Sequence, residues 1–287
     1  MNVEKILVVG AGVMGHGVAL VAARSGFDVV LVDLKDEFVQ RGMKGISDFL
    51  GGSLKRGKIS QSEFDSTLSR IRTSTDVEAE AGNVDFVFEA IIENMDAKAD
   101  LFSRLNKICG KSAIFASNTS QLSITELGEA SGRPELLIGM HWFNPPPLMR
   151  LIEIPMGEKT LRETMEATVA VSRKMGKQPF VCKDSPGFIV NRILNPWYNE
   201  GMNLHDEGVA SVEDIDTAIK AGGGFRMGPL ELRDLVGLDT ALHVTEDLYQ
   251  RLRNDKFKPP ACLRNLVSAG KYGRKTGEGF YTYDNKK

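Results

Sequence analysis

The chain has 287 residues, of which 42% are hydrophobic and 26% charged. This composition is typical of a globular protein and excludes a disordered, collagen-like or disulfide-rich chain. Lysine and arginine number 36 against 38 aspartates and glutamates, so no overall basic field would attract nucleic acid or an anionic membrane. Cys109, Cys182 and Cys262 are isolated in the sequence, which indicates neither a disulfide framework nor a metal site.

The amino-terminal end leaves little room for a targeting segment. The first predicted strand begins at about residue 5, and the few residues before it are too short for a signal or transit peptide. No apolar run approaches the length of a membrane span. We therefore expect a cytoplasmic protein that does not associate with membranes.

Short runs of apolar, often β-branched residues alternate with segments of helical periodicity in the first part of the chain. This alternation predicts an α/β fold, a Rossmann-like doubly wound sheet whose parallel strands are flanked by helices. The predicted strands are KILVV, DVVLV, DFVFEAI, AIFAS, LLIGMHW, LIEIP and PFVC. No strand is predicted from Leu34 to Val84. We expect this stretch to form a projecting helical pair, about 36–71, with helices near 36–57 and 61–71.

The segment VCKDSPGF separates this pattern from an all-helical one. Ser185 suits the N-cap of a helix and Pro186 its first turn, and no strand is predicted beyond them. We predict a Rossmann-like domain over residues 1–184 and an all-helical C-terminal domain over residues 185–287. The helices expected in the second domain lie at about 186–207, 212–221, 229–252 and 260–269.

Gly10, Gly12 and Gly15 follow the first predicted strand in the pattern GxGxxG and open a helix. Gly12 would let a pyrophosphate group approach the backbone, where the N–H groups at the helix start would bind it. Asp33 ends the second strand, where a carboxylate accepts hydrogen bonds from the adenosine ribose and repels a 2′-phosphate. The pattern predicts a dinucleotide site that favours NAD over NADP. Lys35, two positions further, is a feature that would suit NADP.

Among the four histidines, His141 stands apart from His16, His205 and His243, which are interpreted as packed or partly exposed helix residues. His141 lies in GMHWFNPPP at the C-terminal end of a predicted strand, the edge at which a doubly wound sheet binds its ligands. Glu153, in the apolar run LIEIP, would be a costly buried carboxylate without a cation or donor beside it. A histidine paired with such a glutamate is suited to proton transfer, and a purely structural histidine is the alternative.

Longer strings of the sequence match one enzyme family. They are VVGAGVMGHGVA, FEAIIENMDAKADLF, ASNTSQLSITE, GMHWFNPPPLMRLIEI, KDSPGFIVNRIL, MGPLELRDLVGLD and GRKTGEGFY. In their order and spacing, over nearly the whole chain, the sequence resembles the short-chain L-3-hydroxyacyl-CoA dehydrogenases. The resemblance is strongest to the single-function bacterial 3-hydroxybutyryl-CoA dehydrogenases.

The resemblance implies four catalytic residues. His141 matches the family's general base, and Glu153 matches the glutamate that orients it. Ser120 matches the serine that holds the substrate hydroxyl, and Asn191 the asparagine that completes the site. The implied reaction is the reversible, NAD-dependent oxidation of an L-3-hydroxyacyl-CoA to the 3-ketoacyl-CoA, without a metal ion.

The family's cofactor contacts fall on a further set of positions. These are Gly10, Gly12, Gly15, Asp33, Glu93, Lys98, Ser120 and Asn144. Without the resemblance, Glu93 and Lys98 would be interpreted as ordinary surface charges at the start of a helix. Ser120 would be a turn residue in a cluster of polar residues with Asn118.

The CoA portion of the substrate is expected to meet a basic surface. Lys55, Arg56 and Lys58, at the end of the projecting helix, are the candidates. A solvated helix C-terminus is the alternative interpretation of this cluster. Gly51 and Gly52 depart from the family's pattern, and we expect them to loosen this helix.

Two other functions remain open. The same four site residues occur in dehydrogenases of free hydroxy acids, such as gulonate dehydrogenase, which differ in their dependence on CoA. A non-catalytic, crystallin-like NAD-binding protein is the other alternative, although it would not need all four residues. The family pairs two subunits through its second domain, so a homodimer is expected.

Overall fold

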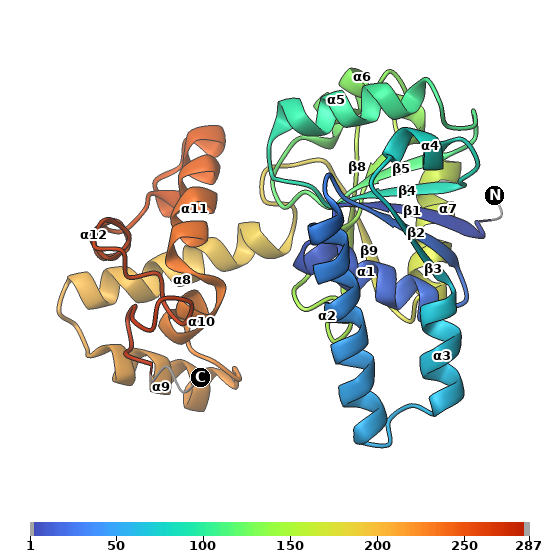
Figure 1. Ribbon diagram of the computed structural model, residues 1–287. Helices are drawn as coiled ribbons and strands as arrows, with labels where there is room; N and C mark the ends of the chain where they lie inside the picture. The colour runs from blue at the N-terminus through green and yellow to red at the C-terminus, as the bar shows by residue number, and fades with distance from the viewer. Residues whose placement is uncertain (1–2, 284–287) are drawn as a thin grey trace. The chain divides into compact units, whose positions relative to one another are not determined.

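The computed structural model describes residues 3–283, which divide into two compact units (Figure 1). The first unit ends at Phe188 and the second begins at Ile189, a few residues beyond the boundary expected after residue 184. Each unit has apolar core residues of its own.

A six-stranded parallel sheet forms the centre of the first unit, in the order β3-β2-β1-β4-β5-β6. Its strands are β1 (Lys5–Val9), β2 (Asp28–Val32), β3 (Ile71–Ser74), β4 (Phe86–Glu89), β5 (Ile114–Ser117) and β6 (Leu137–Gly139). The order reverses at β1, which pairs with both β2 and β4. Doubly wound sheets bind ligands at this switch point, beyond the carboxyl ends of the strands. The predicted Rossmann-like fold class is confirmed.

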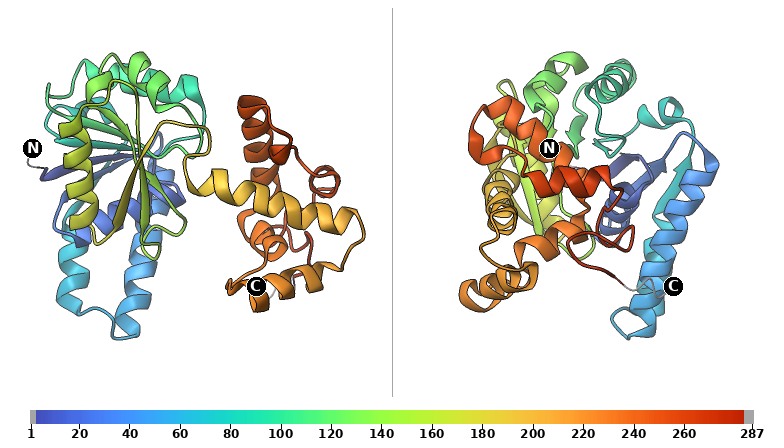
Figure 2. Two further views of the ribbon diagram at one scale, coloured as in Figure 1. Left: turned by 180° about the vertical axis from the view of Figure 1, so that it is seen from behind. Right: turned by 90° about the vertical axis from the view of Figure 1, so that its left-hand side faces the viewer.

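Helices cover both faces of this sheet (Figure 2). The helices of this unit are α1 (Val13–Arg24), α2 (Asp36–Lys55), α3 (Gln61–Ser69), α4 (Val77–Ala81), α5 (Met95–Asn106), α6 (Ile124–Ser131), the 3-10 turn η1 (Pro134–Leu136) and α7 (Arg162–Lys174). Ile6 and Val8 of β1 belong to the core that α1 closes, whereas Leu7 and Val9 belong to the core under α5. Successive side chains of a strand point to opposite faces of the sheet. Because both faces of this sheet are buried under helices, every position of β1 from Ile6 to Val9 is apolar.

The helices α2 and α3 extend from the sheet as a hairpin (Figure 1). A capping box begins α3, in which the Ser60 hydroxyl accepts from the Glu63 N–H and the Glu63 carboxylate accepts from the Ser60 N–H. The prediction of no strand between Leu34 and Val84 is wrong, because β3 lies there, followed by α4. The strand β3 pairs only with β2 at the edge of the sheet, so its sequence, IRTS, lacks the apolar run of a central strand.

A smaller sheet follows in the same unit, in the order β7-β8-β9. Its strands are β7 (His141–Trp142), β8 (Leu151–Met156) and β9 (Gln178–Lys183). The antiparallel pairing of β7 with β8 places His141 opposite Glu153. LLIGMHW is not one strand as predicted, because it divides at Met140 between the two sheets. Pro155 of β8 packs so closely on Gly139 that a Cβ atom there would lie 2.2 Å from the proline Cγ.

Lys177 fastens the loop between β7 and β8. Its Nζ donates to the carbonyl oxygens of Pro146 (2.6 Å) and Met149 (2.7 Å) and lies 5.1 Å from the centre of the Trp142 ring. Burial, together with the nearby charge of Arg24, lowers the pKa of Lys177 to about 8. The loop that leaves β7 is therefore held by an ammonium group that loses its proton more readily in the folded protein than in the unfolded chain.

We expect Lys177 to make the free energy of unfolding depend on pH between about 8 and 10.5. In this window the unfolded chain holds a proton on Lys177 that the folded protein has released, so stability rises with pH. The Lys177→Met variant should lack about 2 kcal/mol of this rise. Urea unfolding at both ends of the window measures it, with the exposed neighbour Lys174→Met as the control. An identical rise in the parent and in Lys177→Met would contradict this prediction.

Helices also make up the core of the second unit. They are α8 (Val190–Asp206), α9 (Val212–Gly223), α10 (Pro229–Val236), α11 (Leu238–Leu252), the 3-10 turn η2 (Asp255–Phe257) and α12 (Ala261–Ser268). The single helix expected over 229–252 is two helices, because Gly237 has a φ of 103° and interrupts it. Within residues 3–283, no helix combines the length and the apolar character needed to cross a membrane.

The predicted helix start at Ser185 is wrong, because α8 begins at Val190. Gly187 and Phe188 have positive φ angles of 74° and 47°, which a right-handed helix does not accommodate. Pro186 lies in the turn that results, in which the Phe188 N–H donates to the Ser185 carbonyl oxygen at 2.9 Å.

Candidate active site

Glycines shape the turn between β1 and α1. Gly10 has a φ of 103°, and a Cβ there would lie 2.4 Å from the Ala90 carbonyl oxygen. A Cβ on Gly15 would lie 1.7 Å from the Gly10 carbonyl oxygen. Gly12 differs, because a Cβ there would meet no atom within 4 Å, and as the N-cap of α1 it makes no side-chain capping bond. Open space at an uncapped helix N-terminus fits a pyrophosphate group.

We expect Gly12→Ala and Gly15→Ala to fail in different ways. Gly15→Ala should lower the free energy of unfolding by about 3 kcal/mol or more, because the backbone of the turn must shift. Gly12→Ala should keep the parent's stability to within about 1 kcal/mol. It should bind NAD about tenfold more weakly or worse, because the methyl group occupies the place of the pyrophosphate. Thermal unfolding and NAD titration measure the two effects, and unchanged NAD affinity in Gly12→Ala would contradict the assignment.

Asp33 holds the glycine turn from the end of β2. Its Oδ2 accepts from the Ala11 N–H and its Oδ1 from the Leu34 N–H, each at 2.7 Å. A cavity of about 510 Å³ lies beside it, lined by Gly10, Gly12 and Asp33 among largely apolar residues. An apolar cavity with a carboxylate at its edge fits an adenosine group. Asp33 therefore has a structural role that the sequence pattern did not predict.

His141 and Glu153 form a buried pair. The His141 Nδ1 lies 2.8 Å from the Glu153 Oε2, and the two residues are 5% and 1% exposed. The imidazole also packs against the rings of Phe143 (4.6 Å between centroids) and Phe188 (5.8 Å). Because an ionised carboxylate only accepts hydrogen bonds, Nδ1 carries the proton and Nε2 remains the basic nitrogen. The arrangement therefore supplies an oriented proton acceptor.

A buried cluster of charges lies at the ends of β4 and β5. Lys98 is 1% exposed, and its Nζ lies 2.5 Å from Glu89 Oε1 and 3.3 Å from Glu93 Oε2. The Ser117 hydroxyl donates to Glu89 Oε2 at 2.5 Å. Burial raises the pKa of Glu89, and the neighbouring Lys98, Ser117 and Ile91 N–H oppose that rise. The interpretation of Lys98 as an ordinary surface charge is wrong.

Glu89 is a candidate that the sequence predictions missed, although a signal was present. It is the acidic residue inside the apolar part of DFVFEAI, just as Glu153 is in LIEIP. A carboxylate in such a run needs a buried partner, and here the partner comes from α5 rather than from a histidine. The same reasoning that selected Glu153 applies to Glu89.

Glu93 and Asn118 hold the turn that contains Ser120. The Glu93 Oε1 accepts from the Thr119 hydroxyl at 2.6 Å and from the Ser120 N–H at 2.8 Å. The Asn118 Oδ1 accepts from the Trp142 N–H at 2.9 Å. The turn is thereby tied to the strand that carries the candidate base.

The two asparagines among the predicted site residues, Asn144 and Asn191, lie elsewhere in the chain. Asn144 is exposed in the loop after β7 and precedes Pro145 through a cis peptide bond. Asn191 is the second residue of α8, in the second unit, and is partly buried. Among the other predicted site residues, the structure brings Glu93, Lys98 and the Ser120 turn together in one cluster, and His141 with Glu153 in another.

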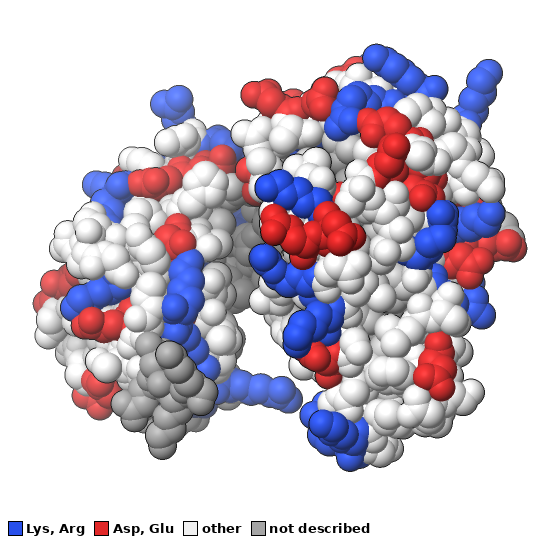
Figure 3. Space-filling model, viewed as in Figure 1, with Lys and Arg blue, Asp and Glu red and all other residues white. Residues whose placement is uncertain are grey.

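The candidate CoA cluster lies at the tip of the α2–α3 hairpin. Lys55, Arg56 and Lys58 are all exposed, and Figure 3 shows basic side chains gathered there. The helix α2 continues through Gly51 and Gly52 to Lys55, so the two glycines do not interrupt it.

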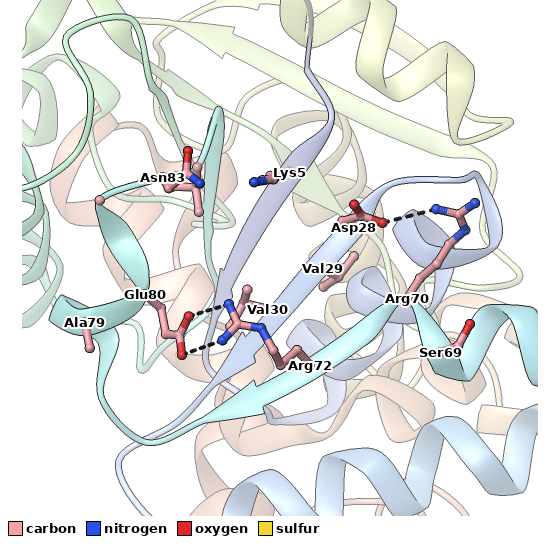
Figure 4. Close-up of a pocket in the computed structure, with 12 residues that line it drawn as sticks. Lys5, Asp28, Val29, Val30, Ser69, Arg70, Arg72, Ala79, Glu80 and Asn83 are labelled. Atoms are coloured by element: carbon pink, nitrogen blue, oxygen red, sulfur yellow. Dashed lines mark hydrogen bonds and ion pairs between the residues drawn. The ribbon is translucent and has the colours of Figure 1, made fainter.

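A second cavity, of about 730 Å³, lies where β1 and β2 begin, at the opposite edge of the sheet from the glycine turn (Figure 4). Four of its charged side chains form two pairs. Arg72 donates to the two Glu80 oxygens at 3.0 and 2.6 Å, and Arg70 to Asp28 at 3.1 Å. None of the predicted site residues lines it. Over residues 3–283, no group of three or more histidine, cysteine or acidic side chains is placed to hold a metal ion.

Two family models together match almost the entire chain. The model of the 3-hydroxyacyl-CoA dehydrogenase NAD binding domain matches residues 5–185, and that of the C-terminal domain matches residues 187–283. A probable 3-hydroxybutyryl-CoA dehydrogenase of Deinococcus radiodurans is 48% identical over 279 residues, which cover 97% of this chain and 100% of the relative. A mitochondrial hydroxyacyl-coenzyme A dehydrogenase of Sus scrofa is 44% identical over 287 residues, covering 98% of this chain and 91% of the relative.

A solved structure shows the same similarity in three dimensions. The crystal structure of (S)-3-hydroxybutyryl-CoA dehydrogenase from Ralstonia eutropha matches with a TM-score of 0.96 and 42% identity, covering 99% of this chain and 100% of that one. The doubly wound sheet followed by a helical unit agrees with these matches. The chain therefore belongs to the 3-hydroxyacyl-CoA dehydrogenase family of NAD-dependent oxidoreductases.

Proposed function

We propose that the protein catalyses the reversible oxidation of an L-3-hydroxyacyl-CoA, foremost 3-hydroxybutyryl-CoA, to the 3-ketoacyl-CoA with NAD. The buried His141–Glu153 pair, at 2.8 Å, is the observation that carries the proposal. It lies in the same unit as a glycine turn with room for a pyrophosphate. An oriented proton acceptor and a dinucleotide site are what the conversion of a hydroxyl to a ketone requires. The names of the similar proteins support the substrate class.

Each catalytic side chain has one role in this reaction. NAD, when bound, supplies the acceptor for the hydride. His141 Nε2 takes the hydroxyl proton, and Glu153 stabilises the imidazolium that forms. Ser120 and Asn191 hold the substrate oxygen so that the carbon and the proton acceptor are aligned. In the reverse direction His141 returns the proton to the oxygen.

The cofactor and substrate contacts complete the proposal. For NAD we propose Gly10, Gly12, Gly15, Asp33, Glu93, Lys98, Ser120 and Asn144. The Asp33 carboxylate would repel a 2′-phosphate, which favours NAD over NADP. For the CoA phosphates we propose Lys55, Arg56 and Lys58, as exposed cations on the hairpin tip.

The assembly of the protein is also part of the proposal. We assign NAD binding to residues 1–184, and substrate binding and subunit pairing to residues 185–287, in a cytoplasmic homodimer. Two observations support the division: the structure separates into units at residue 188, and the two family models meet near residue 186. A monomer at micromolar concentration in a sizing experiment would contradict the pairing.

The substrate proposal predicts a strict dependence on CoA. We expect acetoacetyl-CoA to be reduced with NADH at a kcat/KM about 100-fold or more above that for free acetoacetate, because the CoA portion contributes binding energy. NADPH should support a much lower rate. Rates with acetoacetyl-CoA, longer 3-ketoacyl-CoA esters and the free acid measure these preferences. Equal rates for the ester and the free acid would favour a hydroxy-acid dehydrogenase of the gulonate type, and NAD binding without turnover would favour a crystallin-like role.

A further inference from the structure

The charges at the ends of β4 and β5 form a continuous chain from the core of the first unit to the edge of the candidate site. At the inner end, Glu89 is 0% exposed and its carboxylate accepts from Lys98, Ser117 and the Ile91 N–H, at 2.5, 2.5 and 2.8 Å. At the outer end, Glu93 has a side chain 31% exposed and lies 3.3 Å from the same Lys98 Nζ. Lys98 therefore bridges a buried carboxylate and a partly exposed one.

This arrangement has a net negative charge. Glu89 and Glu93 supply two carboxylates against the one ammonium of Lys98. A buried ion pair generally adds little stability compared with apolar residues of the same size, because both charges lose their hydration. Stability alone therefore does not account for Glu89 and Lys98 in the core of the unit.

Glu93 connects the buried charges to the turn that contains Ser120. Its Oε1 accepts from the Thr119 hydroxyl and the Ser120 N–H, at 2.6 and 2.8 Å. The Thr119 oxygen in turn accepts from the Leu122 N–H at 2.8 Å, which shapes the rest of the turn. A shift of Glu93 would therefore move the backbone that carries the Ser120 hydroxyl.

The same charges adjoin the glycine turn. Glu89 lies opposite Val9 in the β1–β4 register, and the next residue, Ala90, directly contacts Gly10. The nicotinamide ring of a dinucleotide is cationic when oxidised and neutral when reduced. A net negative charge near the ring therefore favours the oxidised form over the reduced one.

We propose that Glu89 is a positioning residue for this enzyme. Through Lys98 and Glu93 it fixes the Ser120 turn, and its charge keeps the cluster net negative, which favours oxidised over reduced cofactor. The inference rests on the proposed function, since it places NAD at this edge of the sheet and the substrate hydroxyl at Ser120.

The Glu89→Gln variant tests the charge and the positioning together. It keeps the shape of the side chain and makes the cluster neutral. The ratio of the dissociation constants for NAD⁺ and NADH should rise about fivefold or more, and kcat should fall about tenfold or more. Glu80→Gln is the matched control, because it removes one half-buried carboxylate that pairs with Arg72 in the cavity of Figure 4, away from the candidate site. It should change neither quantity. A Glu89→Gln protein with both quantities within twofold of the parent would overturn the proposal.

The double variant Glu89→Gln/Lys98→Met separates the two effects. Glu93 alone restores the net charge of the parent cluster, so the NAD⁺/NADH ratio should return to the parent value. The kcat should stay low, because Glu93 then lacks the Lys98 ammonium that ties its Oε2 to the core of the unit. A parent-like kcat in the double variant would overturn the positioning role. If Glu89→Gln does not fold, the kcat of this double variant still tests the positioning role.

Failure of this inference is distinguishable from failure of the proposed function. The dissociation constants are measured by titration without substrate. A parent protein that binds NAD but does not reduce acetoacetyl-CoA would refute the proposed substrate, while the ratio in Glu89→Gln would still test the role of Glu89.

Discussion

Replacing His141 with alanine is expected to lower kcat by about 10³-fold or more, while NAD affinity stays within about twofold of the parent. The alanine cannot accept the hydroxyl proton. The contacts of the imidazole are with Glu153, Phe143 and Phe188, and not with the glycine turn. Steady-state rates with acetoacetyl-CoA and NADH, together with direct titration of NAD, measure the two quantities.

The matched control for this variant is His243→Ala, which removes an exposed imidazole from α11 in the second unit. It should retain the parent kcat. His141→Ala removes the imidazole that pairs with the buried Glu153 carboxylate, so the free energy of unfolding is expected to fall by about 1 to 3 kcal/mol. Assays should therefore be run well below the unfolding temperature. Joint loss of NAD binding and turnover in the folded variant would indicate that His141 is structural.

Replacing Glu153 with glutamine is expected to lower kcat by about 10² to 10⁴-fold with little change in shape. The carboxylate keeps the proton of His141 on Nδ1 and stabilises the imidazolium. A glutamine amide can donate to Nδ1 instead, which places the imidazole proton on Nε2 and removes the basic nitrogen from the substrate side. It also leaves the imidazolium without a compensating charge in a buried site.

Rates and thermal unfolding of Glu153→Gln should be compared with those of Glu166→Gln. Glu166 is an exposed partner of Arg162 on α7, so its variant makes the same chemical change outside the site and should keep full activity. A Glu153→Gln protein within threefold of the parent kcat would show that the tautomer of His141 is set by another group.

The fold was predictable where strands are buried on both faces. KILVV and DVVLV correspond residue for residue to β1 and β2, because burial against helices on both sides leaves a continuous apolar run. A continuous apolar run is absent from the edge strand β3, because only one side chain of IRTS lies in the core. The prediction also fails at LLIGMHW, because apolar periodicity cannot show where a chain passes from one sheet to another.

Helix ends were less predictable than strands. Ser185 and Pro186 are residues that commonly begin a helix, yet α8 begins at Val190. The conformations of Gly187 and Phe188 determine that start, and Phe188 packs in the core of the first unit. The local residue preferences correctly predicted a helix in this region, but tertiary packing moved its start from Pro186 to Val190.

The sequence by itself determined the doubly wound sheet followed by helices, the glycine turn after the first strand and the family. These features depend on short-range patterns and on motif order, which are readable along the chain. The sequence also suggested that Glu153 orients His141, and the structure shows the contact between them across 12 residues of chain. Only the tertiary structure decided that Glu89, 28 residues from Ser117, shares Lys98 with Glu93. Such contacts arise from strand pairing and helix docking, which bring distant residues together and remove them from water. The same burial placed Lys98, an apparent surface charge, inside the unit, because solvent exposure is a property of the packed chain and not of its residue types.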